Sequence, residues 1–188
     1  MKKLSFLLAV VLLAACNPQS NEKESSELTL VQKQMVEDGW RMGDPDEGDL
    51  PAEYGVSARL GIVDNYFDIE LGGDADMVIK IVDIETGSTA RYLFVPHNSR
   101  TTINEIPNGK YYLKFAYGND WMSRSEGYHT EGKFTRNVVY EKSNDFFDFG
   151  DAGSLESVSY SLKIRVERDR RYEGFSTSSI TEEEFFVD

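Results

Sequence analysis

The strictest pattern in this chain is an alternation of apolar and polar side chains within Glu156–Glu167. Its apolar members are Val158, Tyr160, Leu162, Ile164 and Val166. A period of two places alternate side chains on opposite faces of a β-strand, whereas a helix repeats every 3.6 residues. The segment is therefore expected to be a strand with one face on a core and the other in water.

Short apolar runs of this kind recur along the chain from about Val56 onward. The expected strands are Tyr66–Leu71, Met77–Ile84, Arg91–Val95, Thr101–Ile103, Lys110–Tyr117 and parts of Val138–Phe149. Segments with residues that accept positive φ separate them, at Gly72–Asp74, Glu85–Gly87, Pro107–Gly109 and Gly118–Asp120. Because these strands follow one another without helical crossovers, the sequence predicts a single all-β antiparallel sandwich, immunoglobulin-like or transthyretin-like.

Two strands and the C-terminal segment predict how the sandwich is filled. Lys110–Tyr117 carries aromatic and aliphatic residues on one face, and Met77–Ile84 is apolar on nearly both faces. The second pattern is expected of a strand in the middle of a sheet that is covered twice. Thr181 and Glu184 have the spacing of a capping box. A short helical turn is therefore expected at Glu182–Val187, with its phenylalanines folded back on the sandwich.

The N-terminal segment has the layout of an export signal. Two lysines precede the apolar run Leu4–Ala15, which is too short to span a bilayer as a helix. The residues before Cys16 resemble the lipobox of bacterial lipoproteins. That resemblance implies cleavage between Ala15 and Cys16 and acylation of the thiol with chains such as palmitate. Asn17 after the cysteine resembles the outer-membrane sorting pattern, so the protein is expected at the outer membrane, facing the periplasm or the cell surface.

Between the expected signal and the first strand the chain is polar and acidic. The layout is therefore a signal peptide at 1–15, the lipidated cysteine and an acidic tether at 16–53, and a sandwich domain at 54–188. A weak helical pattern at Glu27–Glu37 is expected to dock on the domain edge. Asp44, Asp46 and Asp49 are weak calcium candidates, because their spacing departs from that of an EF-hand. We expect a solvated linker there and no metal.

Three motifs resemble those of one protein family. They are Ile106–Phe115, with Ile-Pro-Asn-Gly before a tyrosine-rich strand, the turn Tyr117–Trp121, and the acidic-aromatic end Glu182–Phe186. The first is similar to the carboxypeptidase-regulatory or transthyretin-like sandwich repeat. Together they resemble a group of uncharacterised Bacteroidetes lipoproteins. The resemblance covers roughly residues 77 to 186; it implies the sandwich fold, with a tyrosine packed between the sheets, and no particular activity.

The sequence offers little catalytic chemistry. It has no nucleophile elbow, zinc-protease motif, paired-cysteine motif or phosphate loop. Its two histidines, His97 and His129, are expected in loops without a carboxylate partner, which disfavours acid–base catalysis. A formal net charge of −13 disfavours nucleic acid. The protein is therefore expected to be no enzyme, to need no cofactor and to bind no nucleic acid.

Aromatic residues near expected loops and strand ends support a binding role. Trp121, Tyr128, Tyr117 and Trp40 are speculative ligand-binding residues, because aromatic rings with polar tips stack on sugars and peptides. Packing in the core is the alternative for each of them. The sequence thus predicts a lipid-anchored binding or structural accessory of the cell envelope. The alternatives are a carbohydrate- or peptide-binding surface module and an adhesion or assembly subunit that pairs through an edge strand such as Arg91–Val95.

Overall fold

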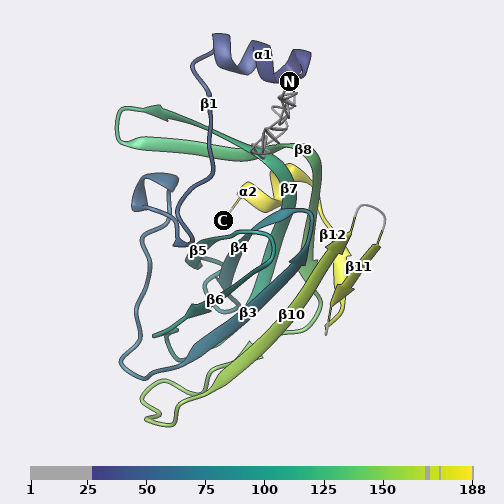
Figure 1. The fold of residues 1–188 in the computed structure, drawn as a ribbon. Helices are drawn as coiled ribbons and strands as arrows, with labels where there is room; N and C mark the ends of the chain where they lie inside the picture. The colour runs from purple at the N-terminus through teal and green to yellow at the C-terminus, as the bar shows by residue number, and fades with distance from the viewer. Residues whose placement is uncertain (1–26, 168–169, 174, 188) are drawn as a thin grey trace, which may run out of the picture.

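Two β-sheets account for most of the fold (Figure 1). The computed structural model describes residues 27–167, 170–173 and 175–187. The helices are α1 (Leu30–Glu37), the 3-10 turn η1 (Ala52–Tyr54) and α2 (Glu182–Phe186). The strands are β1 (Arg41–Met42), β2 (Gly48–Asp49), β3 (Tyr66–Gly73), β4 (Asp76–Asp83), β5 (Thr89–Val95), β6 (Ser99–Ile103), β7 (Lys110–Glu126), β8 (His129–Ser143), β9 (Phe147–Asp148), β10 (Ser159–Glu167), β11 (Arg170–Glu173) and β12 (Thr177–Ser179).

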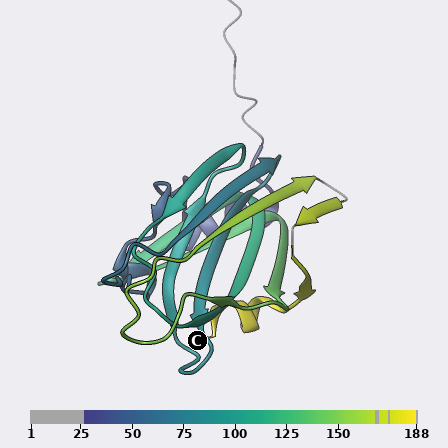
Figure 2. The same ribbon diagram turned by 90° about the horizontal axis from the view of Figure 1, so that it is seen from below.

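The larger sheet is antiparallel, with the order β12-β8-β7-β4-β5-β2 and with β1 and β9 paired to the two ends of β7. The smaller sheet has the order β11-β10-β3-β6. Seen from below, it lies across the larger one (Figure 2). The all-β sandwich expected from the sequence is therefore confirmed. One pair differs from the antiparallel expectation, because β10 runs parallel to β3 over Ser159–Val166.

The main core lies between the sheets. Its larger contributors are Phe67, Ile69, Met77, Ile79, Leu113, Phe115, Phe149, Leu162 and Ile164. The alternation in β10 is confirmed, because Leu162, Ile164 and Val166 are buried in this core and Val158 and Tyr160 pack against it. Tyr111 and Tyr117 of β7 are also buried here, as the alternation in that strand predicts.

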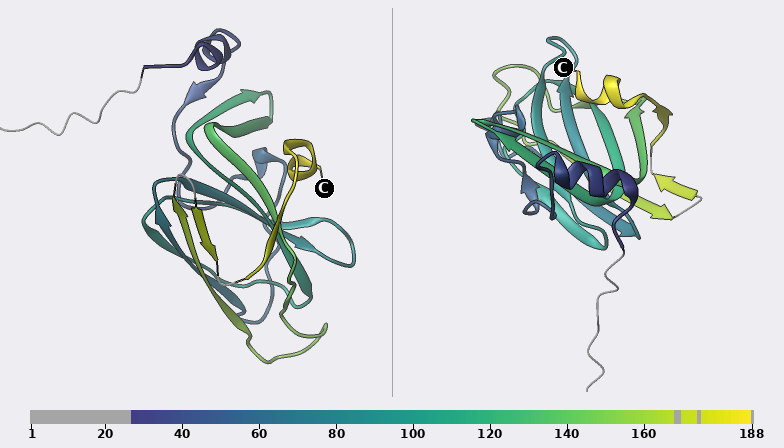
Figure 3. Two further views of the ribbon diagram at one scale, coloured as in Figure 1. Left: turned by 90° about the vertical axis from the view of Figure 1, so that its right-hand side faces the viewer. Right: turned by 90° about the horizontal axis from the view of Figure 1, so that it is seen from above.

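A second core covers the outer face of the larger sheet. Met77 of β4 points into the main core, whereas its neighbour Val78 packs with Phe94, Ala116, Trp121 and others on the far side. β4 is thus buried on both faces, as its continuous apolar run predicts. The far side is covered by η1, α2 and the outer half of the β7–β8 hairpin (Figure 3).

The segment expected to be a tether contributes to this outer layer. From Leu30 it forms α1, then β1 pairs with β7, β2 pairs with β5, and η1 follows. Leu50 is buried in the second core. The tether expected at 16–53 therefore does not extend through this part of the chain. Acidic composition misled the expectation, since strand pairing needs only backbone groups and a few apolar contacts.

The C-terminal helix forms where the capping box predicts it. The Thr181 hydroxyl accepts from the Glu184 N–H at 3.1 Å, and the Glu184 carboxylate accepts from the Thr181 N–H at 2.7 Å. Phe185 is fully buried, whereas Phe186 remains 40% exposed. No helix in the described part of the chain combines the length and the apolar character needed to cross a membrane. The expected signal peptide, including Ala15 and Cys16, lies outside the described residues.

Candidate binding pocket

A pocket of about 410 Å³ opens on the outer face of the larger sheet. Its lining residues come mainly from the β7–β8 hairpin, η1 and α2. Figure 3 shows these three elements on the same side of the larger sheet. Its lining is Trp40, Tyr54, Gly55, Val56, Lys80, Tyr92, His129, Thr130, Glu131, Gly132, Lys133, Glu182 and Phe186. Aromatic walls combined with a few polar groups are typical of ligand sites of this size.

Trp40 reaches the pocket because α1 ends at Glu37 and the chain turns through Asp38 and Gly39. Gly39 adopts φ +88° and its N–H donates to Val36 O at 3.1 Å, while Trp40 N–H donates to Met35 O at 2.9 Å. These two bonds make a Schellman motif, which needs a residue that tolerates a left-handed backbone. The Arg124 guanidinium then lies 5.4 Å from the centre of the Trp40 ring. The helix end and this cation–π contact hold the indole at the pocket wall.

A glycine in β8 allows Tyr54 to pack beneath the hairpin. A Cβ at Gly132 would lie 2.3 Å from a ring carbon of Trp121 and 2.7 Å from one of Tyr54. Those two rings lie 6.3 Å apart, and Trp121 packs edge-on against Phe134 at 4.9 Å. Any side chain at position 132 would therefore separate Tyr54 from the hairpin and open this wall.

Two buried lysines fix α2 at the opposite wall. Lys80 of β4 and Lys114 of β7 are cross-strand partners, and each is less than a tenth exposed. Lys114 Nζ donates to Glu184 O at 2.7 Å and to Val187 O at 2.6 Å, and Lys80 Nζ donates to Phe186 O at 3.4 Å. The last carbonyls of a helix lack intrahelical partners and attract cations. These bonds offset the repulsion between the two ammonium groups and place Phe186 beside the pocket.

The floor combines Lys80 with aromatic rings. Its ammonium lies 5.4 Å from the Tyr92 ring centre and 5.6 Å from that of Phe185. Tyr140 packs on Phe185 at 5.5 Å, and burial, followed by the charge of Glu182, raises the pKa of its phenol. That phenol therefore stays neutral at physiological pH and adds no charge beside the buried ammonium groups of Lys80 and Lys114.

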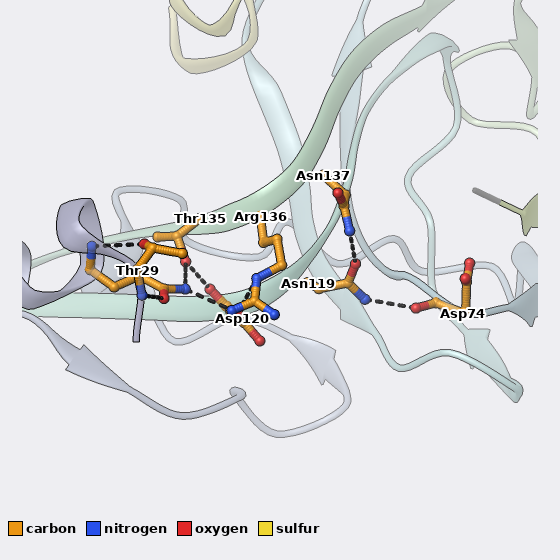
Figure 4. A network of polar contacts seen from close by, with 8 residues as sticks. Thr29, Asp74, Asn119, Asp120, Thr135, Arg136 and Asn137 are labelled. Atoms are coloured by element: carbon orange, nitrogen blue, oxygen red, sulfur yellow. Dashed lines mark hydrogen bonds and ion pairs between the residues drawn. The ribbon is translucent and has the colours of Figure 1, made fainter. Parts of the chain in front are cut away.

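A bulge interrupts the pairing of β7 with β8, and Figure 4 shows the polar contacts around it. The register of β7 and β8 shifts between Tyr117 and Asn119, and Asp120 and Asn137 adopt φ of 56° and 54°. Asn137 Nδ2 donates to Asn119 Oδ1 at 3.1 Å. The turn expected at Gly118–Asp120 was therefore wrong. The chain continues as a strand, because Asn and Asp tolerate single left-handed residues within a bulge and β8 supplies a ladder on both sides of it.

The same bulge anchors α1. Gln32, which is fully buried, donates from Nε2 to Asp120 Oδ2 at 3.0 Å and to Thr135 Oγ1 at 2.9 Å. Arg136 Nε pairs with Asp120 Oδ2 at 3.0 Å. The docking of this helix on the domain edge is confirmed, but through a glutamine. The apolar side chain of Val31, in contrast, is 66% exposed.

The structure does not bring the sequence-predicted aromatic residues together. Trp121 is 1% exposed in the second core, and Tyr117 is 1% exposed in the main core on the other face. Tyr128 is 99% exposed at the tip of the hairpin, away from the pocket lining. Only Trp40 of the four lines the pocket. Alternation in β7 already put Tyr117 inside, whereas Trp121 was misplaced because the strand was expected to end before it.

The weak calcium candidates are likewise separated. Asp49 forms a two-pronged ion pair with Arg91, with one contact of 2.8 Å between Oδ1 and Nε. Within the described ranges, which include Asp44 and Asp46, no group of three or more His, Cys, Asp and Glu residues has the arrangement of a metal site.

The two histidines differ from the sequence expectation. His129 begins β8 and lines the pocket instead of lying in a loop. His97 does lie between β5 and β6, but its ring Nδ1 is 2.6 Å from Asp76 Oδ1. The backbone N–H of His97 donates to the same oxygen at 2.8 Å. This carboxylate partner was missed because the two residues meet only when β4 and β5 pair. The contact closes the end of that strand pair and lies outside the pocket lining.

Comparisons with protein-family models, with curated proteins and with solved structures found no match to this chain. The resemblance to Bacteroidetes lipoproteins and to transthyretin-like domains therefore stays a prediction from the sequence. Lys80, Tyr54 and Gly132 were not singled out by sequence reasoning. The one available signal was Lys80, which interrupts the otherwise apolar run of β4.

Proposed function

We propose that this protein is an exported, lipid-anchored and non-catalytic β-sandwich that binds its ligand in the pocket between the hairpin, η1 and α2. The observation that carries the proposal is the pocket itself. Trp40 and Tyr54 offer aromatic surface, while Glu131, Lys133 and Glu182, although ion-paired within the protein, have further donor and acceptor positions toward the pocket. Such a combination suits a glycan or a peptide segment, both of which present alternating apolar and polar surfaces.

Tryptophan fluorescence tests the binding proposal. The chain has two tryptophans: Trp40 lines the pocket, whereas Trp121 is buried behind Tyr54 and Gly132, so a ligand in the pocket contacts Trp40 and acts mainly on its emission. Panels of soluble glycans and of short peptides are screened through the Trp40 emission of the wild type. Because Trp40→Ala lacks this reporter, each ligand found is then titrated by calorimetry into the wild type and into Trp40→Ala. Tyr128→Ala is the matched control, because that ring is exposed but outside the pocket. Binding that survives Trp40→Ala, or that is lost equally in Tyr128→Ala, would contradict the proposed site.

The anchor is tested separately, at Cys16. Cells that express the wild type or Cys16→Ser are labelled with an alkyne fatty acid and then treated with protease from outside. We expect label on the wild type alone, because Cys16 is the single cysteine of the chain. Accessibility to the protease would assign the domain to the cell surface, and protection would assign it to the periplasm. An unlabelled wild type would refute the lipoprotein proposal.

An adhesion or assembly role through β5 has less support. β5 lies between β4 and β2, and the N–H groups of Leu50 and Arg59 donate to Tyr92 O and Ala90 O. The strand named by Arg91–Val95 is therefore an interior one, and the sequence-based expectation that it is an edge was wrong.

A further inference from the structure

The pocket lies against a strand edge. His129, Thr130, Glu131, Gly132 and Lys133 are consecutive in β8, and all five line it. Successive side chains of a strand point to opposite faces, so five neighbours contribute together only where a pocket adjoins the edge of the strand. The residues paired with them in β7 do not line it.

The outer half of this edge has no partner strand in the described part of the chain. β12 pairs with β8 only at Glu141–Ser143, which is farther along the strand. On the other side of the hairpin, Gly43 N–H donates to Trp121 O at 3.1 Å, so the peptide groups of Trp121 face β1 and point away from β8. Phe134 is the residue paired with Trp121, and its own peptide groups therefore face away from β7.

The pairing continues without a shift from Trp121–Phe134 to the end of the hairpin. By alternation, the peptide N–H and C=O groups of Thr130, Gly132 and Phe134 all face outward along the edge. These five positions, 130 to 134, cover roughly 14 Å at the usual rise per residue. They form a row of donors and acceptors with the spacing that an added strand requires.

The charges beside this edge are already paired within the protein. Glu131 accepts from Arg124 at 3.1 Å, and Lys133 donates to Glu182 at 3.0 Å. The pocket beside the edge also has aromatic surface, from Tyr54 and Phe186. A ligand strand would therefore find backbone partners along β8 and apolar surface within the pocket, which favours aromatic or aliphatic side chains over charged ones.

We propose that the ligand is an extended peptide that adds as a strand to β8 at Thr130–Phe134 and directs alternate apolar side chains into the pocket. This inference rests on the proposed function, because it names the ligand class of the same site. Strand addition draws affinity from main-chain hydrogen bonds and specificity from the pocket that receives every second side chain.

The test uses a displayed library of random twelve-residue peptides, selected on the purified full chain. Selected peptides are synthesised and titrated into the wild type, Thr130→Pro and Thr130→Ala. Proline removes an outward N–H that β7 does not use, whereas alanine keeps that N–H and removes only the hydroxyl contact with Ser125. We expect equal binding to the wild type and Thr130→Ala, and affinity at least about tenfold weaker for Thr130→Pro.

A second measurement does not depend on the proline variant folding. Amide hydrogen exchange of the wild type, with and without a selected peptide, should slow at Thr130, Gly132 and Phe134 on binding. The amides of Glu131 and Lys133, which face β7, serve as internal controls. Unchanged exchange at the three outward amides, or equal peptide affinity for Thr130→Pro and the wild type, would overturn strand addition.

The remaining outcomes separate this inference from the proposed function. If glycans alone perturb Trp40, the pocket binds ligand but the peptide inference fails. If no glycan and no peptide perturbs Trp40, both proposals fail. The inference would also be overturned if the wild type formed a dimer without peptide and Thr130→Pro were a monomer, since a second copy of this chain would then occupy the edge.

Discussion

Replacing Asn65 by alanine should remove a large part of the stability of this fold. Asn65 is fully buried directly before β3. Its Nδ2 donates to Ile106 O at 3.1 Å and to Asn108 Oδ1 at 2.8 Å, and its Oδ1 accepts from Val158 N–H at 2.8 Å. One side chain thus connects the segments before β3, β7 and β10.

The magnitude follows from what the alanine variant leaves behind. A net hydrogen bond stabilises a fold by about 1 kcal/mol, and a buried group left without a partner costs about 1 to 3 kcal/mol. Losing these bonds, with the Ile106 carbonyl and the Val158 N–H losing their partner, should lower the free energy of unfolding by about 3 to 4 kcal/mol. That is a substantial fraction of the roughly 5 to 15 kcal/mol typical of a domain.

Urea unfolding followed by tryptophan fluorescence measures this difference. The midpoint concentration of urea should fall, whereas the slope of the free energy of unfolding against urea concentration should not change. Asn104→Ala is the matched control, because that side chain is exposed and its backbone carbonyl bond to Arg91 survives the change. Asn65→Asp keeps the acceptor for Val158 but turns an oxygen toward the Ile106 carbonyl, so it should also destabilise. A loss for Asn65→Ala below about 1 kcal/mol, or equal to that of Asn104→Ala, would refute the reasoning.

Two further predictions concern the pocket wall and acid. Gly132→Ala should lower the melting temperature by several degrees through overpacking against Trp121, whereas Gly72→Ala should not, since the nearest side-chain atom there is 3.8 Å away; thermal unfolding of both decides. Hydrogen bonds from Arg100 hold the pKa of Asp68 below its ordinary value of 3.8. The unfolded chain therefore takes up this proton first, and the stability that the pair contributes should disappear as the pH falls below that value. Asp68→Asn should lose stability at about pH 7 yet show a shallower fall in acid, and an unchanged acid slope would contradict this.

The local patterns that predicted elements correctly are those that depend on near neighbours. Alternation in Glu156–Glu167 fixed which face of β10 is buried, and the spacing of Thr181 and Glu184 placed α2. Each of these signals is complete within one segment, because side-chain direction and helix capping depend on residues a few positions apart. Tertiary contacts could reinforce such elements but did not have to create them.

The features that were missed depend on residues brought together by folding. The Ile-Pro-Asn-Gly motif predicted a turn, but not that Asn108 would donate to the carbonyls of Asp151 and Ser154. β1 and β2 are two residues long, which is too short for an alternation of apolar and polar residues to predict them. The pocket was missed for the same reason, since Trp40, Lys80 and Phe186 lie in separate segments.

The docking of α1 has a mechanical consequence. Under the proposed anchorage at Cys16, any tension between membrane and ligand enters the domain through the N-terminal side of α1. The first contacts to bear that load are the two hydrogen bonds of Gln32 to the bulge, ahead of the short β1–β7 pairing. The force would thus reach the hairpin that forms one wall of the pocket. Tension on the anchor would therefore act on the same element that contacts a bound ligand.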